Sequence, residues 1–462
     1  MSPQGEDDSM ARLTVAGVGS LLVAMAVAAT SAGPQTRAPQ QPPPSQRPSE
    51  VEVVIRGDAG TPPRMAVPDF VALTPDAAEA ARTIAQVLWD DLNFEREFYL
   101  IARDTYATIP PAQAIEQIPF PSWRELGADA LVFGTVQRTG DTLRVQFRLL
   151  DVATGRTALA KEYSGTATNA RLYAHTASDD IHLQQRALQG VARSKLAFVS
   201  DRTHERTEGL DVKEVFVADY DGGNQQRVTN SRHLNVSPSW SPDGRAVAYT
   251  SFRKVIPDIF ISRIYEGVLE NPLNGVGGNY LPVFSPDGTR IAFFSNRAGN
   301  PEIYVMNRDG SNVRRLTNHP ATDSTPTWSA NGAQIAFTSD RTGQPQIYVM
   351  NSEDGSGLRK LTDEKYADRA TWSPASYNEI AFAARTDTGY DIKVLDLATN
   401  AVRQITQGVG SNESPAYSPS GRHLAFTSRR GGQTNVYLIG RDGRGERQVT
   451  TDGNNFSPAW TR

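Results

Sequence analysis

A repeat of about 44 residues fills the chain after residue 194 and limits what this sequence can fold into. Six aromatic residues mark the repeat, and successive members lie 44, 44, 44, 45 and 43 residues apart. These residues are Trp240, Phe284, Trp328, Trp372, Tyr417 and Trp460. A period of this length that contains four β-prone runs is typical of the blades of a β-propeller.

Each unit repeats the same order of landmarks. An aromatic strand runs into a turn such as Ser-Pro-Asp-Gly at 241–244, and an Ala-Phe strand such as 336–339 follows it. In the unit that contains Trp328 we expect strands over 325–329, 334–339, 346–350 and 358–362. Pro326 lacks a backbone donor, so we place it at the start of the first strand. We expect the aromatic residue to pack between neighbouring blades.

The two ends of the repeat region complete each other. The first Ala-Phe strand, at 197–198, has no aromatic strand before it, and the last aromatic strand, at 457–460, has no Ala-Phe strand after it. The C-terminal strand can therefore supply the missing strand of the blade that begins at Lys195. The sequence predicts a closed ring of six blades without an open edge.

The region before the repeats has a different pattern. Thr74 and Pro75 are suited to open a helix, whose buried stripe is Ala81, Ile84, Ala85, Leu88 and Leu92. Strands are expected over 130–136, 143–149 and 157–163, and a helix over 178–191. We therefore predict a mainly β protein in which a small α/β domain, residues 50–192, precedes a six-bladed propeller, residues 193–462.

The first 49 residues resemble export and linker sequence. Residues 1–32 contain an apolar run from about 13 to 29, preceded by Arg12 and followed by small residues, as in a cleavable signal peptide. The run is shorter than a membrane span needs, although an uncleaved anchor is the alternative. Residues 33–49 are rich in Pro and Gln and predict a disordered linker.

Composition and motifs argue against several functions. The net charge is −4, which does not favour nucleic acid as a partner, and the chain has no cysteine. Motifs for a serine nucleophile, a phosphate loop, a zinc protease and a calcium loop do not occur, and the six histidines are scattered. The Asp-Gly pairs are interpreted as hairpin turns, and the recurring Ser-x-Arg ends as hydrogen bonds that tie loops between blades. We expect no catalytic residues, cofactor or metal ion.

Polar residues just before each aromatic strand are candidates for a binding site. They differ between units, and the symmetry of a ring brings them to one mouth of the channel. A binding surface uses such variation, whereas a solvated loop is the alternative for any one residue. The predicted partner-binding residues are Asn235, Asn279, Asp323, Ser324, Asp368, Arg369, Asn412, Glu413, Asn454 and Asn455.

The chain resembles the TolB family in its Ser-Pro-Asp-Gly repeats and in residues 127–155 and 174–202. The resemblance implies a monomeric periplasmic protein that binds rather than catalyses. It implies that the propeller face binds the peptidoglycan-associated lipoprotein Pal, and that the N-terminal segment engages the inner-membrane protein TolA. This system supports outer-membrane integrity and cell division.

By the same resemblance, the segment that meets the TolA-like partner is a short β-prone run directly after the linker. Its residues are Glu50, Val51, Glu52, Val53, Val54, Ile55 and Arg56. The pattern suits addition of a strand to a partner. The alternatives are a propeller hydrolase or lyase, or a sensor that binds cell-wall fragments at the same face.

Overall fold

The structure is a computed structural model that describes residues 61–207, 209–273, 275 and 277–461. The predicted signal peptide, linker and N-terminal binding segment lie outside the described residues. Among the residues described, no helix is both long enough and apolar enough to cross a membrane.

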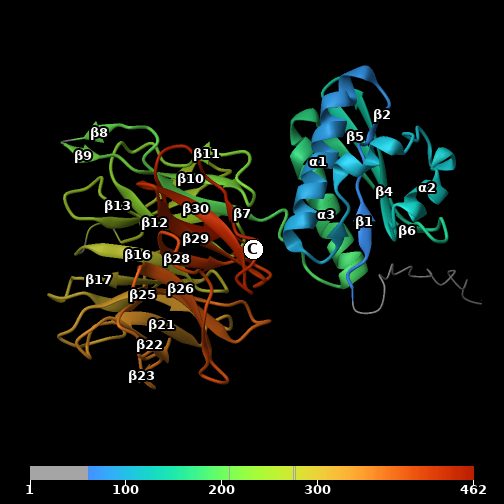
Figure 1. The fold of residues 1–462 in the computed structure, drawn as a ribbon. Coiled ribbons are helices and arrows are strands. Elements are labelled where there is room, and N and C mark those ends of the chain that lie inside the picture. The colour runs from blue at the N-terminus through green and yellow to red at the C-terminus, as the bar shows by residue number, and fades with distance from the viewer. Residues whose placement is uncertain (1–60, 208, 274, 276, 462) are drawn as a thin grey trace, which may run out of the picture. The chain divides into compact units, whose positions relative to one another are not determined.

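The described chain begins with a sheet covered by helices (Figure 1). Strands run in the order β3-β1-β4-β5-β6, with β2 paired to β4. They are β1 (Arg64–Ala66), β2 (Val71–Ala72), β3 (Tyr99–Leu100), β4 (Ala130–Thr139), β5 (Thr142–Asp151) and β6 (Thr157–Thr166). One face packs against α1 (Ala78–Glu95) and α3 (Ala170–Arg186). The other carries η2 (Arg103–Thr108), η3 (Ile115–Gln117) and α2 (Phe120–Glu125).

The helical stripe predicted from the sequence is confirmed in α1, where all five residues are no more than 1% exposed. Thr74 does not cap a helix through its side chain. It precedes the 3₁₀ turn η1 (Pro75–Ala77), and its hydroxyl accepts a hydrogen bond from the Arg138 amide, 3.1 Å away. The second predicted helix was placed wrongly, because α3 begins at residue 170, after η4 (Ala167–Asn169), and ends at residue 186. Tyr173 and Ala174 extend the buried stripe of α3 toward its start.

The remaining described chain forms six four-stranded sheets, which we number as blades 1 to 6, and a small hairpin of β8 (Arg206–Thr207) and β9 (Leu210–Asp211). Blade 1 contains β32 (Asn455–Trp460), β7 (Lys195–Ser200), β10 (Glu214–Asp219) and β11 (Gln226–Arg227). Blade 2 contains β12 (Asn235–Trp240), β13 (Ala246–Ser251), β14 (Asp258–Arg263) and β15 (Val268–Glu270). Blade 3 contains β16 (Asn279–Phe284), β17 (Arg290–Ser295), β18 (Glu302–Asn307) and β19 (Arg314–Arg315).

The later blades continue the same order. Blade 4 contains β20 (Asp323–Trp328), β21 (Gln334–Ser339), β22 (Gln346–Asn351) and β23 (Arg359–Lys360). Blade 5 contains β24 (Ala367–Trp372), β25 (Glu379–Thr386), β26 (Gly389–Asp396) and β27 (Val402–Gln404). Blade 6 contains β28 (Ser411–Tyr417), β29 (His423–Arg430), β30 (Gln433–Gly440) and β31 (Arg447–Gln448). The predicted six-bladed propeller is confirmed.

The ring closes as the sequence predicted. Strand β32 pairs antiparallel with β7, so that Asn455 lies opposite Ser200 and Trp460 opposite Leu196. The last strand is therefore the inner strand of the first blade, and all six blades have four strands.

The aromatic residues pack between blades, as expected. Trp328 of blade 4 packs with Ala292 and Ile303 of blade 3, and its indole N–H donates to the Val283 carbonyl at 3.0 Å. The predicted place of Pro326 is wrong. Strand β20 begins three residues earlier, and Pro326 lies within a β-bulge between Ser324 and Thr327.

Helix α1 contacts blades 1 and 6 through polar and aromatic groups. Tyr220, which follows β10, donates its hydroxyl to Asp91 at 2.8 Å. Phe94 stacks on His423 with ring centroids 4.3 Å apart, and Glu95 accepts a hydrogen bond from Arg422. These side chains belong to residues that are far apart in sequence, so they tie the α/β region to the propeller through tertiary contacts.

Candidate functional site

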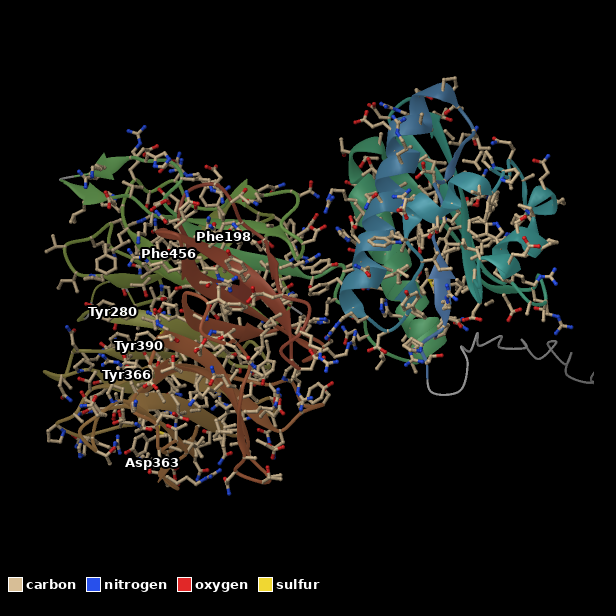
Figure 2. The ribbon with its side chains drawn as sticks, in the orientation of Figure 1. Phe198, Tyr280, Asp363, Tyr366, Tyr390 and Phe456 are labelled. Atoms are coloured by element: carbon tan, nitrogen blue, oxygen red, sulfur yellow. The ribbon has the colours of Figure 1, made fainter. Side chains whose placement is uncertain are left out.

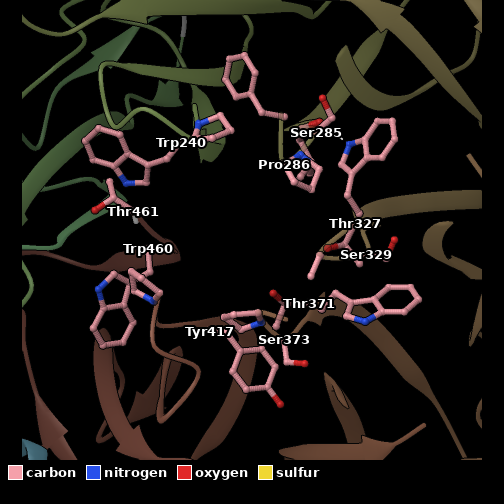
Figure 3. Close-up of a pocket in the computed structure, with 18 of the residues that line it drawn as sticks. Trp240, Ser285, Pro286, Thr327, Ser329, Thr371, Ser373, Tyr417, Trp460 and Thr461 are labelled. Atoms are coloured by element: carbon pink, nitrogen blue, oxygen red, sulfur yellow. Dashed lines mark hydrogen bonds between the residues drawn. The ribbon is translucent and has the colours of Figure 1, made fainter. Parts of the chain in front are cut away.

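The six inner strands β12, β16, β20, β24, β28 and β32 contact one another in sequence around the ring and line a channel. A cavity of about 200 Å³ lies where these strands end and the Ser-Pro turns begin. Figure 3 shows Trp240, Thr327, Thr371, Tyr417 and Trp460 around the opening. Hydroxyl groups and prolines line this end.

Every inner strand contains a bulge at the same place. Its third or fourth residue has a positive φ between 47° and 54°. These residues are Ser237, Leu281, Thr325, Arg369, Ser414 and Ser457. They border a second cavity of about 120 Å³. Side chains other than glycine rarely adopt this conformation, so its recurrence in six blades shows that the bulge is built into the channel wall.

The predicted binding residues all lie at the end of the channel where the inner strands begin, which we call the N-terminal mouth. Five of them, however, are fully buried: Asn235, Asn279, Asp323, Asn412 and Asn455. The Asn412 amide donates to the Asp391 carboxylate of blade 5 at 3.0 Å, and the Asn455 amide donates to the Asn435 side chain of blade 6 at 3.0 Å. These residues link neighbouring blades.

The same linkage occurs in blades 2 and 3, where Asn235 donates to Glu214 and Asn279 donates to Asp258, both at 2.9 Å. In blade 4 the equivalent residue is an acid, and Asp323 accepts two hydrogen bonds from Arg341. Arg341 belongs to the recurring Ser-x-Arg ends, which the sequence indicated as structural; the predicted link between blades is wrong here, because Arg341 and Asp323 belong to the same blade. Each of these five residues makes side-chain hydrogen bonds within the propeller wall, although the side-chain oxygen of Asn235 is buried without a partner among the described residues.

The other five predicted residues are partly exposed at the mouth: Ser324, Asp368, Arg369, Glu413 and Asn454. Asp368 accepts hydrogen bonds from the hydroxyls of Thr325 and Thr338, at 3.1 and 2.8 Å. Asn454 donates to Asp201 at 3.0 Å. These residues can meet a partner, because their side chains are not enclosed.

Aromatic residues at the mouth escaped the sequence analysis. Figure 2 labels Tyr280, Tyr366, Tyr390 and Phe456. The ring of Tyr280 stacks on Phe294 with centroids 4.8 Å apart, and Tyr366 and Tyr390 meet edge to face at 5.5 Å. Tyr280 and Phe456 each directly follow a buried Asn, and this spacing could have indicated them.

Apolar side chains are also exposed in loops around the mouth. Val255 is fully exposed and Val409 is 58% exposed; Leu210, which is 70% exposed, belongs to strand β9 of the hairpin that follows β7. Val409 lies just before β28, and Val255 lies in the loop that leaves β13 beside the start of β12. Exposed apolar groups gathered near a channel entrance are typical of a protein-docking surface.

A second polar cluster contains His175, Asp219 and Asp221, whose potential ligand atoms lie within 4.8 Å of one another. Cations already neutralise it: Arg171 pairs with Asp221, and the Lys195 ammonium lies 2.8 Å from Asp219. Burial opposes protonation of His175, but the carboxylates of Asp219, 3.7 Å away, and of Asp91, which is hydrogen-bonded to the ring, outweigh burial and raise the pKa of His175 to about 10. The described side chains of this cluster thus form an ion-pair network.

Comparisons with known proteins agree with the geometry. Residues 185–462 match the family model for the TolB beta propeller domain, and residues 51–158 match that for the TolB amino-terminal domain. The crystal structure of TolB from Acinetobacter baumannii has a TM-score of 0.72 and 28% sequence identity, covering 87% of this chain and 97% of that chain.

Two curated relatives are each named Tol-Pal system protein TolB. The relative from Desulfosudis oleivorans is 35% identical over 44% of this chain and 45% of its own length. The relative from Ruegeria sp. is 35% identical over 42% of this chain and 44% of its own length. The matched region thus spans less than half the length of these relatives. Because the propeller model alone matches more than half of the sequence, the chain belongs to the TolB family.

Proposed function

We propose that this protein is a non-enzymatic periplasmic adaptor of a Tol–Pal system, which binds a Pal-like lipoprotein at the N-terminal mouth of its propeller. The observation that carries the proposal is the surface around that mouth, where Val255 and Val409 are exposed and Tyr280 is half-buried. Relatives named Tol-Pal system protein TolB support the choice of system. Binding of a partner that covers these side chains would remove their apolar surface from water, which contributes favourable free energy to the complex.

A second partner, similar to TolA, binds the segment of residues 50–56. Its alternating apolar residues suit addition of a strand to the edge of a partner sheet. Residues 1–32 direct export and are cleaved, and residues 33–49 form the linker that precedes the α/β domain of residues 50–192. Binding at the mouth changes the availability of this segment, so that the two partners are coupled, and the system supports outer-membrane integrity and cell division.

Isothermal titration with the soluble domain of the Pal-like lipoprotein from the same genome tests the first partner. Val409→Asp places a charge in the proposed interface and should weaken binding at least tenfold. The matched control is Val402→Asp on the outer strand β27, where a valine of similar exposure, 45%, lies away from the inner strands. Equal affinities of the two variants and the unmodified protein would contradict docking at this mouth.

The second partner requires a separate experiment. Deletion of residues 50–56 should abolish capture of the TolA-like protein, whereas deletion of residues 40–46, which removes the same number of linker residues, should leave it intact. A cell that produces only the first deletion should leak periplasmic enzyme and divide in chains. Normal envelope integrity in that cell would contradict the proposed role.

A further inference from the structure

The α/β domain holds a cavity that the propeller site does not use. It has a volume of about 470 Å³ and lies on the sheet face that carries η2, η3 and α2 (Figure 1). Strands β2 and β4 and the chain from residue 103 to 113 contribute to its walls. Ligand sites commonly have volumes of about 300–1,000 Å³, so this cavity is large enough to hold a ligand.

Aromatic side chains line the cavity: Phe70, Tyr106, Trp123 and Phe133. The rings of Tyr106 and Trp123 meet edge to face, with centroids 5.4 Å apart. Trp123 and Phe70 are buried, whereas Pro110 and Pro111 are exposed at the rim. A ligand can therefore enter from solvent and bury apolar surface against these rings.

One hydrogen-bonding group of the aromatic lining is free. The Tyr106 hydroxyl donates to the Ile101 carbonyl at 2.9 Å and accepts from the Val67 amide at 3.0 Å. The Trp123 indole N–H, by contrast, donates to no other described residue and is not fully buried. Aromatic faces beside a free donor suit a polyproline II segment, because its rings pack on aromatic side chains and its backbone carbonyls have no partners within the segment.

The rim of the cavity is acidic. Asp69 pairs with Arg103, and the Asp69 side chain is 60% exposed. Asp104 is exposed and pairs with no cation of the described chain. Two carboxylates and one guanidinium leave a net charge of −1 on the residues that line the cavity. A segment that is both rich in proline and cationic therefore fits this site best.

The chain itself contains such a segment. Residues 33–49, which lie outside those described, include six prolines, two arginines and no Asp or Glu. A polyproline II helix has about three residues per turn, so the rings of Pro39 and Pro42 would share one face. Residues 42–44 are consecutive prolines, and Arg47 follows them. The composition thus matches the cavity in both chemistry and charge.

The linker is long enough to reach the cavity. Thr61, the first described residue, precedes Ala66 by five residues, and Ala66 lies opposite Leu131, which lines the cavity. The cavity wall is therefore within about 22 Å of Thr61. Pro44 precedes Thr61 by seventeen residues, and a flexible chain of this length spans about 23 Å on average. Docking within one molecule thus requires no stretching of the chain.

We propose that residues 39–44 dock into this cavity of their own α/β domain as a polyproline II segment. Proline rings pack against Tyr106 and Trp123, a backbone carbonyl accepts the free indole N–H, and Arg47 lies near the acidic rim. A short tether gives an effective concentration of about 1 mM, so an intrinsic Kd of about 0.1 mM keeps roughly nine molecules in ten docked. Neither proposed partner of the protein takes part in this contact.

Fluorine NMR of residues 33–462 labelled with fluorotryptophan reports on the cavity, because Trp123→Phe identifies the Trp123 signal. A proline variant that combines Pro42→Ser, Pro43→Ser and Pro44→Ser should undock the segment and shift this signal, since the ring gains contact with water. An unshifted signal would overturn docking within the chain. The matched control combines Gln35→Ser, Gln40→Ser and Gln46→Ser, which keep every linker proline, and its signal should match that of the unmodified protein.

The acidic rim gives an independent test on the domain side. Asp104→Lys should weaken docking and move the Trp123 signal part of the way toward that of the proline variant. Glu125→Lys is the matched control, because Glu125 is an exposed acid of α2 that does not line the cavity. Equal signals in the two lysine variants would refute the contact between the rim and the cationic linker.

A synthetic peptide of residues 37–48, added to the proline variant, should return the Trp123 signal to its position in the unmodified protein, with half the change near 0.1 mM. The same peptide with serine at 42–44 should have no effect. If the peptide leaves the signal in place, the cavity does not bind the linker. If Val53→Ser with Ile55→Ser shifts the signal and the proline variant does not, residues 50–56 occupy the cavity and the proposed occupant is wrong.

Discussion

The indole N–H of Trp460 donates a hydrogen bond to the Ser194 hydroxyl, 2.7 Å away, and so ties the last strand of the chain to the residue before the first strand of the propeller. A backbone hydrogen bond joins the same two segments: the Thr461 amide donates to the Lys195 carbonyl at 2.9 Å. The ring is therefore sealed by contacts between residues from opposite ends of the repeat region.

Removal of the Trp460 side chain should open this seal. We expect Trp460→Ala to lower the free energy of unfolding by about 3 kcal/mol, because it removes both the ring and the hydrogen bond. Trp460→Phe keeps most of the ring and should lose about 1 kcal/mol. Urea unfolding followed by circular dichroism measures both values. If Trp460→Ala were as stable as the unmodified protein, the last strand would contribute nothing to closure.

The buried amides of the mouth should affect stability rather than binding, and the adjacent residues Asn412 and Glu413 provide the comparison. Asn412 is fully buried, donates to Asp391 and accepts from the Ser428 hydroxyl at 2.7 Å. Asn412→Ala should therefore lower the free energy of unfolding by about 1–3 kcal/mol, since it leaves buried groups unpaired.

Glu413→Ala should leave stability within about 0.5 kcal/mol and change the affinity for the Pal-like lipoprotein instead. Thermal unfolding and isothermal titration on the same two variants separate these effects. The reverse pattern, with a stable Asn412→Ala that no longer binds, would show that the buried amide itself takes part in recognition.

The architecture could be predicted because each blade repeats the same local sequence pattern. A strand, a Ser-Pro turn and an aromatic residue recur with one period, and closure follows from the unmatched ends. The helix α3 was misplaced because its first turns combine Tyr173 and Ala174 with polar residues, so its apolar stripe is narrow.

The site was predicted less well. The first residue of the inner strand is Asn or Asp in four of the six blades, and the second residue of β28 is Asn412; this recurrence was a sign of a structural role rather than of variation. Hydrogen bonds between neighbouring blades, such as that from Asn455 to Asn435, cannot be inferred without the ring geometry. Tyr390 joins Tyr366 only through folding, because it comes from a different strand of blade 5.

A buried carboxylate links blades 5 and 6. Glu379 is 3% exposed and accepts hydrogen bonds from Arg403, 3.0 Å away, and from the Arg441 Nε, 2.7 Å away. Burial opposes its ionisation, but the two arginines outweigh burial and hold its pKa below the usual value. The stabilisation should therefore be complete above the unfolded pKa near 4.5 and be lost as the pH falls below it.

Glu379→Ala should lower the free energy of unfolding by about 3–5 kcal/mol, because two arginines lose their buried partner. Asp387→Ala is the matched control, since the Lys365–Asp387 pair is 73% and 90% exposed and its loss should not change stability measurably. Urea unfolding at pH 7 gives both values. Equal stability of the two variants would show that water replaces Glu379 without penalty.

His423 should make the fold sensitive to acid. It is 2% exposed and stacks on Phe94 of α1. Burial lowers its pKa to about 4; the charge of Glu95 opposes this change, and that of Arg422 adds to it. An unfolded histidine has a pKa of about 6.5, so between about pH 6.5 and 4 the unfolded chain binds a proton that the folded chain does not. The free energy of unfolding should therefore decrease as the pH is lowered from about 6.5 to 4. The contribution of this residue is up to about 1.4 kcal/mol per pH unit.

The variant His423→Phe keeps a flat ring against Phe94 and removes the proton-binding group. Urea unfolding of both proteins at pH values from 4 to 7 isolates the contribution of His423, because the other titrating groups cancel in the difference. Relative to the unmodified protein, the variant should gain stability steadily as the pH decreases. If the two proteins lost stability in parallel as the pH fell, His423 would be accepting a proton in the folded state. That would require water to reach its ring between α1 and blade 6.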